Sequence, residues 1–234
     1  MSAQFAQVQH EPGIARPAGV PRGRTAEAGS AALGKLGIVV RFARNETIFN
    51  QGDETRYSYE VVSGGVRLSK MLLNGRRQIA DFALPADLFG FESTDEYSLT
   101  AEALCDVVAV RYSRSHIERL GEEIADVRRQ LTASLRRELQ LAQNHLVMLG
   151  RQSAKERVAA FLVLLAGRSA VDERGMLDLP MGRQDIADYL GLTIETVCRA
   201  ISEFRHIGLI AVPNRHAIRL LRPEALERYA EADE

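Results

Sequence analysis

Apolar and polar positions alternate with a short period between residues 36 and 112, where turn residues separate brief strand-like segments. Asn74-Gly75 lies between two such segments, which predicts a hairpin with a type I′ turn. Regular short strands with turns between them are typical of an antiparallel β-roll of jelly-roll type. The expected strands are Ile38–Phe42, Thr47–Phe49, Tyr59–Val62, Val66–Leu73, Gln78–Leu84 and Val107–Tyr112.

The period changes after residue 115, where apolar residues recur every three or four positions up to residue 149. This spacing predicts one long helix over residues 116–149 with a continuous apolar seam. Such a seam is longer than one small barrel would cover, so we expect it to join two copies of the chain in a homodimer. The expected interface residues are Ile117, Leu120, Ile124, Val127, Leu131, Leu135, Leu139 and Leu146.

Residues 182–208 predict a helix, a tight turn and a second helix. Ile186, Ala187 and Leu190 share one face of the first helix, and Gly191 supplies the turn. Thr193 is a candidate N-cap for the second helix. In that helix the expected buried face is Val197, Ile201, Phe204 and Gly208.

The opposite face of the second helix carries side chains that can contact DNA bases. A helix-turn-helix places the start of its second helix in the major groove, where Arg pairs with guanine and Glu accepts from cytosine N4. Arg199 and Glu195 are such residues, although a pair at this spacing is also an ordinary surface feature of helical hairpins. The strand-like segments on either side of Pro213–His216 favour the DNA-binding interpretation, because they predict a wing. The expected DNA contacts are Thr193, Glu195, Thr196, Cys198, Arg199, Ser202, Arg215 and His216.

These patterns predict an α+β chain with four parts. We expect a flexible tail over 1–30, a β-roll over 31–115, a dimerisation helix over 116–150 and a winged helix-turn-helix domain over 151–234. A helix over 153–166, with Ser153 and Glu156 as its capping box, would begin the last part. A small strand over Met176–Leu179 would follow that helix.

Composition and charge change this picture little. The net charge of −1 gives no general reason to expect nucleic acid, but residues 181–222 hold six Arg against four acidic residues, which permits DNA binding. No apolar run approaches the roughly 18 residues of a membrane span, and the first residues lack the pattern of a signal peptide. We therefore expect a cytoplasmic protein that contacts no membrane.

The order of β-roll, long helix and winged helix-turn-helix resembles the CRP/FNR superfamily of bacterial transcription regulators. The most specific segments are Gln51-Gly52-Asp53, Tyr59–Leu68, Lys155–Ala159 and Arg183–Val197. Within the superfamily the chain is similar to the FNR and FixK branch, which carries Glu-x-x-Ser-Arg in the recognition helix. Glu195 and Arg199 match that motif, whereas Cys198 stands where Ser is usual.

The resemblance implies an activator rather than an enzyme. Its partners would be a TTGA-type inverted repeat in double-stranded DNA, a second copy of the chain and RNA polymerase. Its targets would be genes for microaerobic or anaerobic respiration or for nitrogen fixation.

The resemblance also narrows the choice of cofactor, and we expect none. FNR-type regulators bind an iron–sulfur cluster through four cysteines, and this chain has two. Cyclic-AMP receptors use a Gly-Glu pair for the ribose and Arg-Ser/Thr-Ala for the phosphate. The corresponding segments here are Gly90-Phe91-Glu92 and Leu99-Thr100-Ala101, so Leu99 stands where the phosphate-binding Arg is expected. The remaining model is FixK-like, with activity set mainly by the amount of protein.

Two alternatives remain open. A haem-dependent nitric-oxide sensor of the same superfamily would use His116 and His145 as candidate axial ligands. A cupin-type enzyme would hold a metal in the barrel, yet residues 38–112 contain no His and offer only carboxylates such as Glu54, Glu60 and Asp81.

Cys198 is a candidate redox-sensitive residue. Arg199 and the nearby helix start favour its thiolate, and an oxidised adduct would collide with the major groove. The simpler interpretation is that Cys replaces Ser as a small contact residue. Cys105, in the barrel, is expected to be inert.

Overall fold

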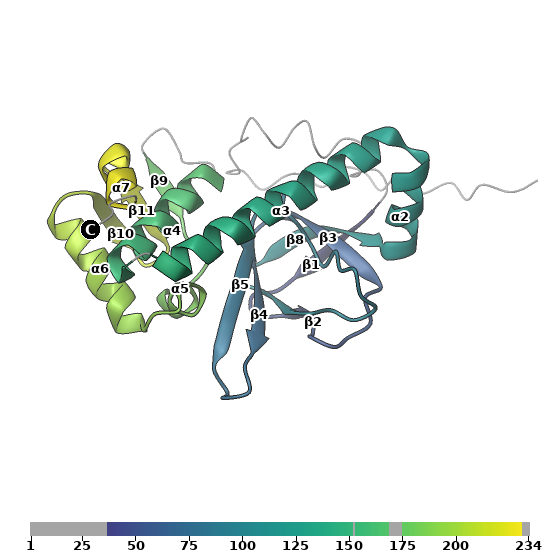
Figure 1. Ribbon diagram of the computed structural model, residues 1–234, viewed down its shortest axis with the longest axis horizontal. Helices are drawn as coiled ribbons and strands as arrows, with labels where there is room; N and C mark the ends of the chain where they lie inside the picture. The colour runs from purple at the N-terminus through teal and green to yellow at the C-terminus, as the bar shows by residue number, and fades with distance from the viewer. Residues whose placement is uncertain (1–36, 152, 169–174, 231–234) are drawn as a thin grey trace, which may run out of the picture.

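A computed structural model describes residues 37–151, 153–168 and 175–230 (Figure 1). The tail expected over 1–30 lies outside these residues. No helix within the described ranges is long and apolar enough to cross a membrane.

The first part of the chain forms two four-stranded antiparallel sheets, with strand orders β1-β8-β3-β6 and β2-β7-β4-β5. Rings of Phe49, Tyr59, Phe89 and Tyr97 stack between them. The predicted β-roll is therefore confirmed. Its strands are β1 (Ile38–Phe42), β2 (Thr47–Phe49), β3 (Tyr57–Ser63), β4 (Val66–Met71), β5 (Arg77–Ala83), β6 (Leu88–Phe89), β7 (Thr100–Ala103) and β8 (Val107–Ser113).

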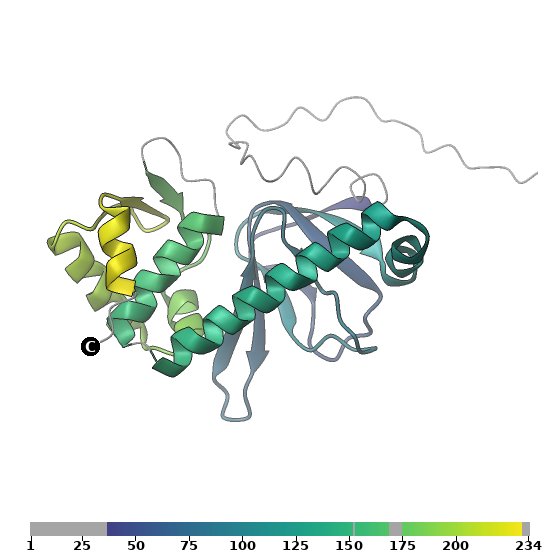
Figure 2. The same ribbon diagram turned by 45° about the horizontal axis from the view of Figure 1, so that its top comes forward.

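The β4–β5 hairpin projects from the barrel (Figures 1 and 2). Its turn is not the type I′ turn expected from Asn74-Gly75, because Gly75 has a positive φ of 76° and Asn74 does not. The N–H of Leu72 bonds to the carbonyl of Arg76 at 2.8 Å and encloses a three-residue loop. Gly75 occupies the left-handed position of that loop, as is usual in three-residue hairpins.

The single long helix expected over 116–149 is two helices, α2 (Arg114–Glu123) and α3 (Ala125–Arg151). Ile124 between them is extended, with φ −116° and ψ 109°. Ile117 and Leu120 before the break and Val127 after it are buried in one cluster with barrel residues. The chain bends at Ile124 so that both helices cover the barrel. The expectation that Ile117, Leu120 and Val127 form a dimer seam is therefore wrong, since their own chain buries them.

The last part of the chain is the predicted winged helix-turn-helix, with the three-stranded sheet β10-β11-β9. Its capping box is present: the N–H of Ser153 donates to Glu156 Oε2 at 3.0 Å, and the N–H of Glu156 donates to Ser153 Oγ at 3.4 Å. The elements are α4 (Ala154–Arg168), β9 (Met176–Asp178), α5 (Arg183–Leu190), α6 (Ile194–His206), β10 (Ile210–Asn214), β11 (Ala217–Leu220) and α7 (Pro223–Ala230).

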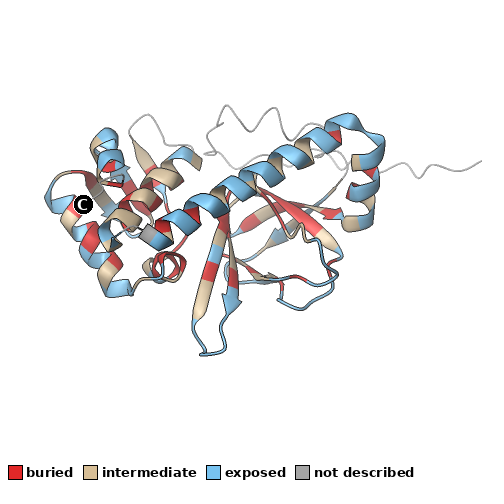
Figure 3. Ribbon diagram, in the orientation of Figure 1, coloured by how far each residue is buried: buried red, intermediate tan, exposed pale blue. Residues whose placement is uncertain are grey.

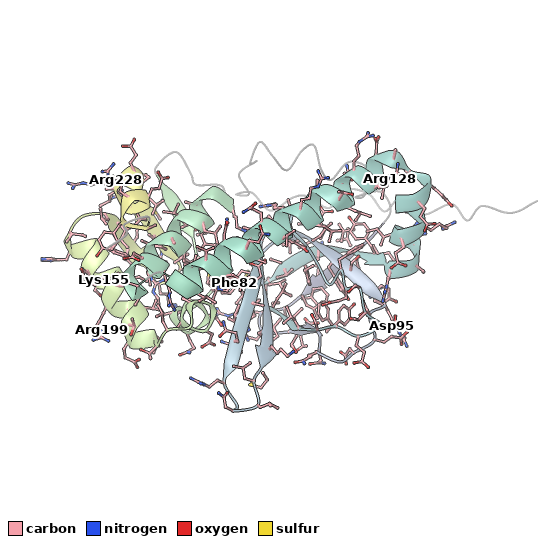
Figure 4. The ribbon with its side chains drawn as sticks, viewed as in Figure 1. Phe82, Asp95, Arg128, Lys155, Arg199 and Arg228 are labelled. Carbon is pink, nitrogen blue, oxygen red and sulfur yellow. The ribbon has the colours of Figure 1, made fainter. Side chains whose placement is uncertain are left out.

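One apolar core joins the two parts. Phe82 of β5 lies at the joint (Figure 4), with its ring 6.1 Å from Phe161 of α4 and 5.3 Å from Tyr189 of α5. Met148 of α3 belongs to the same cluster. The core positions α5, and with it α6, against the β-roll.

Candidate DNA-binding surface

The turn between α5 and α6 forms as its residue types dictate. Gly191 has φ 64° and its N–H bonds to the carbonyl of Ala187, which ends α5. Thr193 caps α6, because its Oγ1 accepts a hydrogen bond from the N–H of Thr196 at 3.3 Å. Val197, Ile201 and Phe204 are buried beneath α6, as their spacing predicted.

The opposite face of α6 is open to solvent. Glu195, Cys198, Arg199 and Ser202 are exposed and Thr196 is half-buried. Figure 4 shows the Arg199 side chain extending away from the body of the molecule. The predicted contact residues of the recognition helix therefore form one continuous surface at its N-terminal end, the end that a helix-turn-helix inserts into the major groove.

Glu195 and Arg199, both within the described ranges, form no ion pair with each other, although an Arg four positions after a Glu can do so on a helix. Hydrogen bonds from the backbone N–H of Glu195 and the hydroxyl of Thr193 hold the pKa of the Glu195 carboxyl below its ordinary value, and the charge of Arg199 adds to this effect. Glu195 is thus ionised and able to accept a hydrogen bond. Both side chains are free to contact base edges.

The wing lies beside the recognition helix. β10 extends through Pro213 to Asn214, and the turn is tighter than expected because Asn214 Oδ1 accepts a hydrogen bond from the N–H of His216 at 2.8 Å. Arg215 is exposed at the tip and His216 is half-buried. Arg215 is therefore better placed for a phosphate than His216.

The sequence did not single out Arg183 or Arg205, which line a cavity of about 160 Å³ on the exposed side of α6 together with Cys198 and Ser202. Burial lowers the pKa of the Arg183 guanidinium, and its buried Nη1 makes no hydrogen bond to any described residue. Arg183 begins α5, where a sequence pattern gives no sign that the side chain reaches the exposed side of the next helix. This arginine adds positive charge beside the predicted contact residues.

Three of the four acidic residues in 181–222 are paired away from the DNA side, and the fourth, Glu195, lies on it. Asp185 and Asp188 of α5 pair with Arg67 and Arg77 of the β-roll. Glu203 pairs with Lys155 at 2.7 Å. The outer face of α6 and the wing is therefore more positive than the count of charges along the sequence suggested.

The β-roll and α3 enclose a cavity of about 310 Å³, lined in part by Asp81, Asp87, Glu92 and Glu138. Its arginines are engaged: Arg168 pairs with Asp81 and Asp87, and Arg137 pairs with Asp87. Leu99 also lies in the wall. The carboxyl groups of Glu92 and Glu138 form no ion pair with any described residue, and Leu99 offers no charge. This lining does not suit a cyclic phosphate, so these residues do not fit a cyclic nucleotide.

The two candidate haem ligands, His116 and His145, do not lie together in one site. His145 is buried, with its ring stacked on Tyr189 at 3.9 Å between centroids. Its Nε2 lies 2.9 Å from the carbonyl oxygen of Tyr189, and burial lowers the pKa of the imidazole. His116 lies on α2 beside Arg119, far from His145 along the helices (Figure 1). The structure gives His145 a packing role.

The carboxylates considered for a metal-dependent enzyme are separately engaged. Glu54 pairs with Arg56, Glu60 accepts a hydrogen bond from the Tyr112 hydroxyl, and Asp81 pairs with Arg168. Among the described residues no group of three or more His, Cys, Asp or Glu side chains is arranged to hold a metal ion.

Known proteins share both parts of the chain. A Crp-like helix-turn-helix domain matches residues 156–229, and a cyclic nucleotide-binding domain matches residues 39–123. The nitrogen fixation regulation protein FixK of Bradyrhizobium diazoefficiens is 42% identical over 202 residues, covering 84% of each chain. FixK of Rhizobium meliloti is 39% identical over 198 residues, covering 85% of this chain and 90% of the relative.

The solved structure of FixK2 from Bradyrhizobium japonicum has the same fold. It matches with a TM-score of 0.79 at 39% identity, covering 85% of this chain and 100% of the FixK2 chain. The exposed recognition helix, its wing, the β-roll and these relatives lead to one conclusion: this chain belongs to the CRP/FNR family of DNA-binding transcription regulators, within its FixK-like branch.

Proposed function

We propose that this protein is a homodimeric activator that binds TTGA-type inverted repeats and controls genes of microaerobic or anaerobic respiration or of nitrogen fixation. One observation carries the proposal: Glu195 and Arg199 lie exposed in the first turns of a recognition helix, and neither forms an ion pair with any described residue. Relatives named as nitrogen fixation regulators support the choice of target genes. We also propose RNA polymerase as a protein partner and the cytoplasm as its location.

The proposed dimer uses a narrower surface than the sequence suggested. One stripe of α3, which includes Ser134, Leu141 and Met148, faces its own chain, and a second apolar stripe displaced around the helix faces solvent (Figure 3). Leu135, Leu139 and Leu146 of this outer stripe are 43%, 60% and 71% exposed. A second copy of α3 would bury them in a two-stranded seam. Ile124 is also exposed, whereas Leu131 packs partly against its own barrel.

The substitution Leu139→Glu tests this dimer. A carboxylate in the seam would lose its water without gaining a partner, so we expect monomers that no longer bind an inverted repeat tightly. Ala133→Glu is the matched control, because Ala133 is exposed on α3 about a third of a turn around the helix from Leu139. Sedimentation and gel-shift titration measure both properties. A wild-type protein that is monomeric on its operator would refute the dimer.

Selection of bound sites from a random DNA pool tests the sequence preference. We expect TTGA-type half-sites in inverted repeat. A set of recovered sites without two-fold symmetry would contradict the proposed function.

We further propose that the β-roll takes no cyclic nucleotide and that activity follows the amount of protein. The acidic cavity beneath α3 supports this proposal. Titration with cyclic AMP should change neither the melting temperature nor operator affinity. A saturable shift in either quantity would contradict this part of the proposal.

A further inference from the structure

The first helix of the helix-turn-helix is held by side chains from outside its own domain. Arg77 of β5 donates from Nη2 to Asp185 Oδ1 at 2.8 Å and from Nε to Asp188 Oδ2 at 2.9 Å. Arg67 of β4 donates from Nη1 to Asp185 Oδ1 at 3.3 Å. Two arginines of one hairpin thus form ion pairs with aspartates on two successive turns of α5.

These ion pairs are shielded from solvent, and the Arg67 guanidinium is held in one orientation. The four side chains are at most 24% exposed. The Arg67 guanidinium is fixed by Glu102, to which it donates two hydrogen bonds of 3.0 and 3.2 Å. Charge-assisted bonds of this kind constrain direction as well as distance.

The far end of α5 is held in the same way. The carbonyl oxygen of Tyr189 accepts hydrogen bonds from His145 Nε2 of α3 at 2.9 Å and from Gln78 Nε2 of β5 at 3.4 Å. The short turn after Leu190 and the buried contacts of Val197 make α6 follow any rotation of α5. The β-roll therefore determines the direction in which the recognition helix points.

The apolar core around Phe82 holds the two parts together, but apolar contacts are not directional. The hydrogen-bonded ion pairs beside that core are directional. We propose that Arg67 and Arg77 are positioning residues that set the angle of the recognition helix against the β-roll. In the dimer this angle fixes the separation of the two recognition helices, and so the half-site spacing that the protein accepts. The inference rests on the proposed dimeric binding of inverted repeats.

The test compares wild type with the double variant Arg67→Gln/Arg77→Gln on a series of operators. The spacer between the half-sites is lengthened or shortened by one or two base pairs, and a single half-site completes the series. We expect wild type to show a sharp spacing optimum. In the variant the preference for that optimum should fall by about tenfold, while affinity for the single half-site changes less than about twofold. A purely structural role would not separate these two measurements.

Arg76→Gln is the matched control, because Arg76 lies on the same hairpin, is exposed and carries the same charge. Asp188→Asn is a second test, since it removes the ion pair of Arg77 with residue 188 and leaves the N-terminus of α5 intact. Asp185 is avoided because its Oδ2 accepts the N–H of Gly182 at 3.0 Å and so caps α5. We expect Asp188→Asn to broaden the spacing profile and Arg76→Gln to leave it unchanged.

The outcomes separate the two proposals. A wild-type protein without any spacing preference would refute dimeric binding, and this inference with it. A sharp wild-type optimum that both the double variant and Asp188→Asn retain would overturn the positioning role alone. Equal losses on single half-sites and on repeats would also overturn it, because they would show that the arginines only support folding of α5.

Discussion

Arginines occupy two contrasting regions of this molecule. At the joint between the β-roll and the helix-turn-helix, Arg67, Arg77 and Arg168 are largely buried and each has a carboxylate within 3.3 Å. On the DNA side, Arg199 and Arg215 are exposed and form no ion pair with any residue that the structure describes. The buried guanidinium groups at the joint are balanced by carboxylates of their own chain, whereas the exposed ones on the DNA side are available to an external partner.

Removing a joint arginine should have the largest effect on stability. Arg168 is 6% exposed, and the charges of Asp81 and Asp87 hold its pKa above its ordinary value although burial alone would lower it. Arg168→Met leaves buried carboxylates without their cation, so we expect a loss of about 3–5 kcal/mol in the free energy of unfolding. Urea denaturation measures this loss.

Arg137 provides a sharp control, because it pairs with the same Asp87 but is 47% exposed. An ion pair with an exposed partner contributes little, so Arg137→Met should cost less than about 1 kcal/mol. Equal losses for the two variants would contradict the contrast between buried and exposed arginines.

The DNA-side arginine should affect recognition rather than stability. Arg199→Ala removes a guanine contact, and we expect about 1–3 kcal/mol less discrimination between the operator and an operator with that base pair changed. Its melting temperature should remain that of wild type. Gel-shift titrations on both DNAs check the prediction, which an unchanged ratio of specific to non-specific affinity would refute.

Glu138 of α3 lies beside the same joint, but its carboxyl forms no ion pair with any residue that the structure describes. Burial, with the nearby charges of Asp81, Asp87 and Glu92, raises its pKa from 4.5 to about 7. Arg137, Arg168 and His145 line the same cavity. Between pH 4.5 and 7 the folded state holds a proton that the unfolded state has lost, so the stability contribution of Glu138 falls as pH rises through this window.

Glu138→Gln should remove that pH dependence. We expect the variant and wild type to have similar stability at pH 4.5, and the variant to be more stable by about 1–2 kcal/mol at pH 8. Denaturation at several pH values checks this, with the exposed Glu122→Gln as control. A wild-type-like pH profile in Glu138→Gln would show that the carboxyl is ionised at neutral pH.

Cys198 should give the smallest effect under reducing conditions, where Cys198→Ser is expected to bind DNA as wild type does. Peroxide should abolish wild-type binding by converting the thiol to sulfenic acid as peroxide is reduced to water. The Ser variant should be insensitive and reductant should restore wild type. Cys105→Ser should behave as wild type, because burial raises the pKa of that half-buried thiol. Oxidant sensitivity that persists in Cys198→Ser would exclude this cysteine as the switch.

The sequence predicted elements whose signals are local. The alternating strands and the helix-turn-helix have both the right periodicity and the right turn residues, and the structure confirms them. β6 and β7 were missed, because β6 has two residues and β7, Thr100–Ala103, is rich in residues that disfavour strands. The break at Ile124 was missed because the apolar spacing continues across it.

The joint could not be predicted, because its partners are distant in sequence. Arg67 and Asp185 are separated by 118 positions, and in the sequence Asp185 is an ordinary acidic residue of an amphipathic helix. Contacts of this kind depend on how two folded units meet, which periodicity does not encode. The sequence named Leu135, Leu139 and Leu146, but their separation from the residues that face their own chain became evident only in three dimensions, as did the place of Arg183.

The core around Phe82 limits how such chains can be exchanged by recombination. The two domain models end and begin on either side of α3, yet Phe82 of the first packs against Phe161 and Tyr189 of the second. A fragment that starts at residue 153 would expose these rings to water and should aggregate. A chimera that joins the β-roll of one relative to the recognition domain of another would need matching residues at 82, 161 and 189. The smallest inheritable unit of this regulator is therefore larger than either domain.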